Sequence, residues 1–329
     1  MRRASTGMTL GAAIGTALLV TCGSGGLTPT AAARPIVSAA SQSPGAVRAY
    51  WTSARMRSAE PAGVLARGPL DLGPSSGRLD GAAAKRATGQ AVAIPNARRY
   101  PYRTHGKVFF TLGLGPDAGD YTCSGTAVRG ATRDLVWTAG HCVYDPGPLG
   151  SGEATNWEFV PGFQDGRKPY GEWPADRLST TSQWMNSGGV SGEDFAHDFG
   201  AANVARRNGR RLEDVIGARR IAFGQSRDFL YRAFGYPADP PFNGRRLYRC
   251  NSPYEGEDDG EGPPPPMRIA CDMTAGASGG GWEISRHHRG RKRRYVASVT
   301  SYSIVGDSNH LYGPYQGGVA RQLYRSAGG

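Results

Sequence analysis

The sequence Cys-Asp-Met-Thr-Ala-Gly-Ala-Ser-Gly-Gly-Gly, residues 271–281, places a serine between glycines near the C-terminus. Glycine tolerates positive φ and leaves room for a substrate beside the backbone, so this pattern suits a nucleophilic serine on a tight turn. Such a turn would aim the backbone N–H groups of Gly276 and Ser278 at a carbonyl oxygen that becomes an oxyanion. Because the same pattern is common in ordinary loops, a second motif is needed before it indicates catalysis.

A second motif, Leu-Val-Trp-Thr-Ala-Gly-His-Cys at residues 135–142, lies upstream. Its apolar run predicts a buried strand, and the Thr-Ala-Gly turn would present His141 at the end of that strand. A single histidine beside a strand is usually structural. Here, however, Cys142 follows it, and Cys123 precedes it within Tyr-Thr-Cys-Ser-Gly-Thr, residues 121–126. With these motifs the chain resembles the chymotrypsin/trypsin-like serine endopeptidases. Within that family it resembles the secreted bacterial branch, which includes the glutamyl endopeptidases.

The resemblance extends over about residues 107–320 and implies an all-β fold of two six-stranded antiparallel β-barrels, with the active site between them. The barrels are expected at about residues 103–208 and 209–329. The residues agree with an all-β protein, because short apolar runs such as 108–112 and 295–302 are separated by turns rich in Gly, Pro and Asp. Only the C-terminal end, residues 318–327, predicts a helix.

The order of the chemical groups along the chain excludes a rival fold. The pattern Gly276-x-Ser278-x-Gly280 also fits the nucleophile elbow of α/β-hydrolases. That fold carries its acid and its histidine after the serine, whereas only a short tail that opens with a basic run follows Ser278. The order histidine, aspartate, serine matches the chymotrypsin-like arrangement.

The acidic member of a catalytic triad must then lie between His141 and Ser278. Asp198 is the best candidate because it opens the small, apolar run Phe-Gly-Ala-Ala-Asn-Val, as the acid does in the family; Asp194, in what looks like an exposed loop, is the alternative. A buried Asp198 would orient the imidazole and stabilise its protonated form. This chemistry requires no metal and no organic cofactor, and its partner is a protein or peptide substrate.

The resemblance places the primary specificity pocket around Asp272, six residues before the serine, and around Thr300 and Ser301 on the following strand. A carboxylate in a desolvated pocket would favour Arg or Lys before the cut bond. Two departures weigh against this, since Thr274 replaces a cysteine of the trypsin-like pattern and Cys271 adjoins Asp272 directly. A small or apolar pocket is the alternative. Glutamyl endopeptidases have a histidine at the position of Thr300, so a preference for Glu is not expected.

Residues 1–33 have the three parts of a secretory signal peptide: Arg2 and Arg3, the apolar run 8–20 and the small-residue stretch 30–33. The apolar run is too short for a membrane span, so we expect no stable membrane insertion. The expected location is therefore extracellular. The alternative is a lipoprotein anchored at Cys22.

Cysteine usage supports export. Of the five cysteines, Cys22 would leave with the signal peptide, and an even number in an exported chain implies disulfides. The sequence alone allows three pairings of the remaining four. The resemblance implies Cys123–Cys142 and Cys250–Cys271. Zinc ligation is disfavoured because the sequence has no C-x-x-C and no H-E-x-x-H.

Residues 34–98 are rich in Ala, Arg, Gly, Pro and Ser. Apart from a short helix predicted at 53–60 they show no sustained apolar period, and such a segment cannot bury enough surface to fold alone. We expect a pro-segment before a protease domain at 99–329, with a disordered linker as the alternative. The candidate processing sites are Lys85-Arg86 and Arg98-Arg99.

Activation is expected to differ from that of trypsin-like zymogens. Those zymogens switch on when a new N-terminal amine pairs with an aspartate just before the serine, and that position is Ala277 here. The hypothesis is that the turn around Ser278 forms without this pair, and that the pro-segment blocks the cleft or assists folding.

Charge is distributed unevenly, since +8 of the formal net charge of +12 lies in residues 1–98. A nucleic-acid-binding protein concentrates basic residues on its binding face, so no nucleic-acid partner is expected. The dense basic run at 286–294 predicts a solvated hairpin loop, with attachment to anionic surfaces as the alternative. The sequence thus predicts a secreted, monomeric serine endopeptidase made as a zymogen. The alternatives are a catalytically inactive protease-like binding protein and a lipid-anchored protease.

Overall fold

The computed structural model describes residues 35–66, 89–113, 118–146, 152–188 and 195–329. The chain divides into Met1–Ala32 and Ala33–Gly329, and all described residues belong to the second unit. The expected signal peptide with Cys22, the Lys85-Arg86 site and the alternative acid Asp194 lie outside the described residues. Within the described ranges, no helix combines the length and the apolar character that crossing a bilayer requires.

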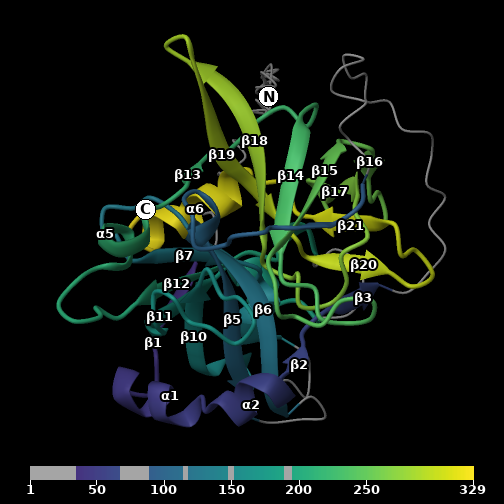
Figure 1. The fold of residues 1–329 in the computed structure, drawn as a ribbon. Helices are drawn as coiled ribbons and strands as arrows, with labels where there is room; N and C mark the ends of the chain where they lie inside the picture. Colours follow the sequence, from purple (N-terminus) through teal and green to yellow (C-terminus); the bar gives the residue numbers. More distant parts are fainter. Residues whose placement is uncertain (1–34, 67–88, 114–117, 147–151, 189–194) are drawn as a thin grey trace, which may run out of the picture. The chain divides into compact units, whose positions relative to one another are not determined.

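Six antiparallel strands of the first half form a closed ring in the order β11–β10–β5–β6–β7–β12, because β12 pairs again with β11 (Figure 1). Its interior holds large apolar side chains, among them Phe110, Trp137 and Phe159. The expected first barrel is therefore confirmed. Its strands are β5 (His105–Leu112), β6 (Gly119–Ala127), β7 (Leu135–Thr138), β10 (Thr155–Pro161), β11 (Trp173–Thr180) and β12 (Gly200–Val204).

The second half is also antiparallel in its main strands, but its hydrogen bonds form two sheets rather than one closed ring. One sheet has the order β13–β19–β18–β14–β15–β4 and the other β16–β17–β21–β20–β3. The disulfide Cys250–Cys271 joins them, since Cys250 lies in β15 and Cys271 directly follows β17. The strands are β4 (Val92–Ala93), β13 (Arg220–Ile221), β14 (Leu230–Gly235), β15 (Tyr248–Pro253), β16 (Gly256–Glu257), β17 (Met267–Ala270), β18 (Gly281–His288), β19 (Arg291–Val299), β20 (Tyr302–Ile304), β21 (His310–Gly313) and β3 (Val64–Ala66).

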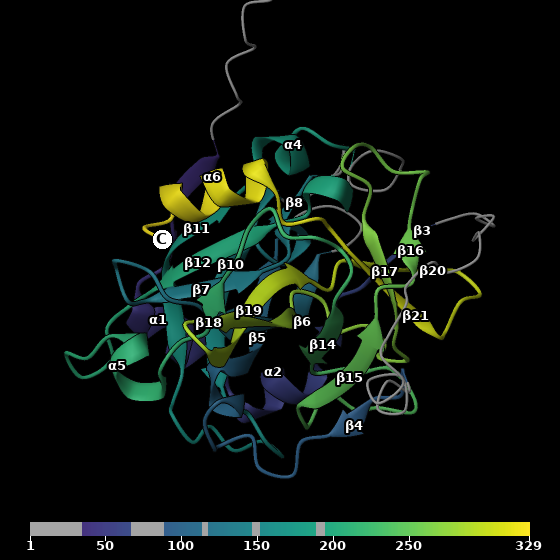
Figure 2. The same ribbon diagram turned by 90° about the horizontal axis from the view of Figure 1, so that it is seen from above.

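The helix predicted at the C-terminal end is present as α6 (Gly318–Ser326), which packs against β12 of the first half (Figure 2). The basic run at 286–294 forms the largely exposed end of the β18–β19 hairpin, as predicted. Further short elements are β8 (Tyr144–Asp145), β9 (Gly152–Glu153), α4 (Ser182–Met185) and α5 (Leu212–Ile216).

Residues 35–58 pack on the first barrel. Strand β1 (Ile36–Ala39) extends the sheet by antiparallel pairing with β11, and two helices follow, α1 (Pro44–Tyr50) and α2 (Ser53–Ser58). The second helix corresponds to the one predicted at 53–60. The segment buries Val47, Trp51 and Met56 in a cluster that includes Phe109 of β5. It therefore obtains from the barrel the apolar partners that its own composition lacks.

Three further pairings connect the N-terminal part to both halves. Strand β2 (Glu60–Pro61) runs parallel to β6, and β3 runs parallel to β20. Strand β4 pairs antiparallel with β15, and Ile94, which follows it, is buried.

A buried charged cluster joins the two halves. Glu283 of β18 accepts bonds of 2.5 and 2.8 Å from Arg219, and His105 Nε2 of β5 lies 3.3 Å from the same carboxylate. The other ring nitrogen of His105 lies 3.0 Å from the hydroxyl of Thr126. Burying these charges is tolerable only because they are paired and hydrogen-bonded.

Candidate active site

His141 lies directly after β7, in a short 3-10 turn formed by Gly140–Cys142. The apolar sequence of β7 buries that strand completely, which fixes the start of the turn. The disulfide Cys123–Cys142, with a Cα–Cα distance of 6.2 Å, ties the residue after His141 to β6. The imidazole is 9% exposed, so it lies at the floor of a site rather than on an open surface.

Asp198 lies two residues before β12 and is fully buried. Its Oδ2 lies 2.9 Å from Nδ1 of His141, and its Oδ1 accepts a bond of 2.8 Å from the backbone N–H of His141. Ser301 donates its hydroxyl proton to Oδ2 over 2.5 Å. Both carboxylate oxygens are thus satisfied, and the imidazole is held in one orientation with Nδ1 facing the acid.

Nε2 of His141 is buried and has no hydrogen-bond partner in the part of the chain that the structure describes. This is the nitrogen that would accept a proton from a nucleophile. Although Cys123, His141 and Cys142 lie within 4.8 Å of one another, the two sulfur atoms form a disulfide and offer no thiolate to a metal ion.

Ser278 is buried to 4% exposure in a turn that glycines make possible. Gly276 has φ +89° and Gly279 has φ +77°, values that favour glycine. A side chain at Gly279 would collide with Thr138 of β7, so the serine turn approaches the first barrel as closely as its backbone allows.

Ser124 of β6 holds this turn from the opposite half. Its backbone N–H donates to the carbonyl of Ser278 over 2.7 Å, and its hydroxyl donates to the carbonyl of Gly276 over 2.8 Å. The same hydroxyl accepts a bond of 2.9 Å from the backbone N–H of Tyr236. Ala277, at the position of the aspartate in trypsin-like zymogens, is buried among apolar residues. The bonds that hold the turn to Ser124 are therefore between neutral groups. Ser124 was not among the predicted site residues, although it stands next to Cys123 in the motif that was used.

One of the two expected oxyanion donors already has a hydrogen-bond partner within the chain. The backbone N–H of Gly276 donates to the carbonyl of Ala62, in the segment between β2 and β3, over 2.8 Å. This contact could not be foreseen, because it joins residues more than two hundred positions apart.

The three expected pocket residues all have partners within the chain. Oδ1 of Asp272 accepts a bond of 2.7 Å from the backbone N–H of Ala91, just before β4. Thr300 accepts from the indole N–H of Trp282 over 2.9 Å, and Ser301 binds Asp198. Ser301 therefore supports the acid, a role that the sequence did not predict for it. A carboxylate has about four acceptor positions, so one bond to Ala91 leaves Asp272 able to accept others.

Solved structures with a similar fold include several proteases. The protease Anisep from Arthrobacter nicotinovorans is 35% identical, with a TM-score of 0.61, over 72% of this chain and 99% of that one. The thermostable serine protease AL20 from an extremophilic microorganism is 36% identical, with a TM-score of 0.59, over 69% and 97%. A Glu endopeptidase, 17% identical with a TM-score of 0.53 over 72% and 96%, shares the fold. No family model matches the chain, and no curated protein matches it.

Proposed function

Because the chain belongs to the bacterial chymotrypsin-like serine proteases, we propose that it is a secreted serine endopeptidase with the triad His141, Asp198 and Ser278, made as a precursor. The observation that carries the triad is the buried carboxylate of Asp198, which binds both the ring and the backbone of His141. Nε2 of His141 has no hydrogen-bond partner in the described part of the chain, so it is free to accept the proton of Ser278 in the proposed reaction.

The proposed reaction has two halves. His141 takes the hydroxyl proton of Ser278 while the serine oxygen attacks a peptide carbonyl, and the backbone N–H groups of Gly276 and Ser278 bind the oxyanion. The protonated imidazole, stabilised by Asp198, then gives its proton to the departing amine, which leaves an acyl-enzyme. A water molecule, activated by the same imidazole, hydrolyses the ester and restores the serine.

Covalent labelling with a fluorophosphonate tests this proposal against a protease-like binding protein that has lost catalysis. The processed protein should be labelled on Ser278, and Ser278→Ala should not be labelled. Ser308→Ala is a matched control, because Ser308 is exposed on the loop before β21. No label on the processed wild type would favour the binding-only alternative, and label on another residue would contradict the assignment of Ser278 as the nucleophile.

The precursor proposal is supported by residues 35–66, which pair with both halves of the protease. Strands β1 and β2 pair with the first half, and β3 pairs with the second half. Residues 89–97 pair with the second half through β4 and the Ile94 N–H bond to the carbonyl of Leu247, and Ile94 and Ala97 are buried in a cluster that also includes Phe109 of the first barrel. We therefore place the processing cut before Gly89, in agreement with Lys85-Arg86 and not with Arg98-Arg99. N-terminal mass spectrometry of the secreted protein would locate the cut and would also detect a lipid on Cys22.

Secretion is supported by the two disulfides, which persist in oxidising compartments. For primary specificity we retain Arg or Lys through Asp272, with a small or apolar residue as the alternative. Hydrolysis of a peptide library by the processed protein would distinguish them.

A further inference from the structure

Residues 60–66, called the strap below, lie along both sides of the candidate active site. On one side Glu60 and Pro61 pair with Tyr121 and Thr122 of β6, and the N–H of Ala62 donates to the carbonyl of Thr122 over 2.8 Å. On the other side β3 pairs with all three residues of β20, the strand that directly follows Ser301 (Figure 1).

Between these two pairings the strap accepts a hydrogen bond from a backbone N–H that the proposed reaction needs. The carbonyl of Ala62 accepts the backbone N–H of Gly276, the proposed oxyanion donor, over 2.8 Å. A substrate carbonyl cannot accept the same N–H while this bond is present. Gly63 packs against Ala275, the residue before Gly276, so the strap also contacts the start of the serine turn.

The orientation of the imidazole indicates how a substrate would lie. Nδ1 of His141 faces Asp198 and, through it, Ser301 and β20. Nε2, which must protonate the departing amine, is at the opposite edge of the ring, and the Cys142–Cys123 disulfide holds this part of the site next to β6. The departing half of a substrate should therefore lie along β6 and the acyl half along β20.

The strap runs in the opposite direction to such a substrate. Its N-terminal part lies along β6 and its C-terminal part lies along β20, and it pairs in parallel with both strands. If the bond between Ala62 and Gly63 were attacked, the departing amine would be that of Gly63, which lies against Ala275. Because the strap runs in reverse, this amine would depart toward β20 and not toward β6, the side on which Nε2 of His141 lies.

We propose that the strap is a built-in competitive inhibitor that crosses the cleft in reverse and blocks it without being cut. This inference rests on the proposed function. Residues 35–58 anchor the strap through β1 and through the burial of Val47, Trp51 and Met56. Parallel pairs are slightly less stable per residue than antiparallel ones, which suits a segment that must later leave.

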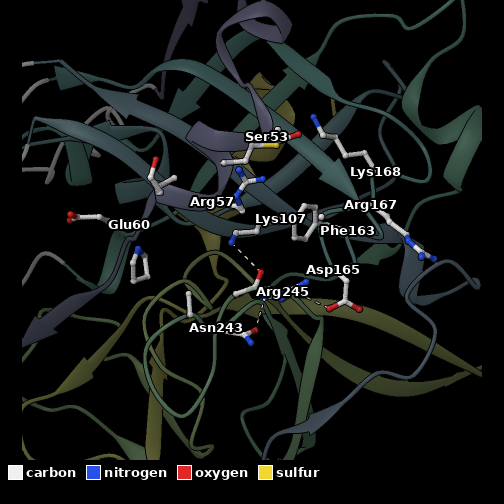
Figure 3. A pocket seen from close by; sticks show the side chains of 17 residues that line it. Ser53, Arg57, Glu60, Lys107, Phe163, Asp165, Arg167, Lys168, Asn243 and Arg245 are labelled. Atoms are coloured by element: carbon white, nitrogen blue, oxygen red, sulfur yellow. Dashed lines mark hydrogen bonds and ion pairs between the residues drawn. The ribbon is translucent and has the colours of Figure 1, made fainter.

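A cavity of about 710 Å³ beside the strap also suits a segment that must later leave (Figure 3). Glu60 and Pro61 form part of its wall, and buried Lys107 lines it and donates to the carbonyl of Gly244 over 3.1 Å. The β2 end of the strap is therefore not packed against a continuous floor. Once the connection to residue 89 is cut, the fragment that carries the strap and its anchor, residues 35–58, is held only by non-covalent contacts and is no longer kept at a high effective concentration.

The test uses residues 34–329 and compares the rate of fluorophosphonate labelling of Ser278 before and after limited proteolysis between residues 67 and 88. We expect the uncut chain to label at least about tenfold more slowly, with residues 60–66 intact by mass spectrometry after long incubation. Equal rates, or a cut between Ala62 and Gly63 in the uncut chain, would overturn the inference alone. Absence of label in both forms would overturn the proposed function as well.

A matched pair of variants tests the contact itself. In Gly63→Ala the new methyl would lie 2.6 Å from the side chain of Ala275, so the uncut chain should label about tenfold faster than wild type, as expected from overpacking. Gly45→Ala in α1 has nothing within 4 Å of the new methyl and should leave the rate unchanged. After the cut, both variants should label at the wild-type rate. A Gly63→Ala precursor that labels as slowly as wild type contradicts the contact.

Discussion

Replacing Glu283 by Gln should destabilise the protein by several kcal/mol. The carboxylate is fully buried, receives two hydrogen bonds from Arg219 and lies 3.3 Å from His105. Glutamine has nearly the same shape but no charge, so Arg219 would stay buried without its counter-charge. Breaking a buried ion pair in this way costs about 3–5 kcal/mol. Since whole domains are stable by about 5–15 kcal/mol, the loss is a large share of the total.

Thermal unfolding followed by circular dichroism measures this effect. For a domain of this size each kcal/mol shifts the unfolding temperature by about 2–4 °C, so Glu283→Gln should unfold roughly 6–20 °C below wild type. Asp228→Asn is the matched control, because it also removes one carboxylate but at an exposed position. A Glu283→Gln protein that unfolds within about 2 °C of wild type would refute the reasoning.

The same cluster predicts a pH dependence. Burial alone would raise the pKa of Glu283, but His105 and Arg219 hold it at about 2, below its ordinary 4.5. Because the pKa is lowered in the folded state, the stabilisation is complete above 4.5 and is lost as the pH falls toward 2. Wild-type stability should decline in this window, and the decline should be smaller in Glu283→Gln. Parallel stability curves for the two proteins would contradict this assignment.

Three further predictions concern the site and its processing. Ser278→Ala should abolish peptide hydrolysis without lowering the unfolding temperature, because only the attacking oxygen is removed; more than trace activity in the pure variant would contradict the mechanism. Asp272→Ser should reduce cleavage after Arg by about 100-fold or more, while sparing small activated esters, and equal cleavage of Arg and Leu substrates by the wild type would exclude the charged pocket. A chain that begins at Gly89 should unfold at a higher temperature than one that begins at Arg99, because burial of Ile94 alone contributes about 1.5–3 kcal/mol; equal temperatures would remove the argument for retaining β4.

The parts of the site that could be predicted are those with local causes. The apolar run of β7 followed by Thr-Ala-Gly is enough to place His141 at the end of a buried strand. The glycines at 276 and 279 adopt the positive φ that the serine turn requires, and this requirement is visible in the sequence. Asp198 could be selected because few acidic residues between His141 and Ser278 directly precede a small, apolar run.

The parts that could not be predicted depend on contacts between distant residues. Composition describes what residues 34–98 can bury by themselves, and it contains no information about the barrel surface that covers Trp51. In the same way, Asp272 is recognisable as a carboxylate at an expected pocket position, but its bond to Ala91 depends on where β4 joins the second half. The division of the second half into two sheets follows from strand register, which short apolar runs do not specify.

These distant contacts also explain why the strap is suited to control the site. The proposed chemistry needs His141 and Asp198 from the first half together with Ser278 from the second, and Ser124 of the first half holds the serine turn in place. A segment that touched only one half could be displaced by motion of the other. The strap pairs with β6 and β20 and accepts the N–H of Gly276 between them, so it binds only when both halves are assembled. An inhibitor with this requirement would also favour the assembled precursor during folding, since a ligand that binds only the folded state stabilises it. Blocking the cleft and assisting folding are then two consequences of one set of contacts.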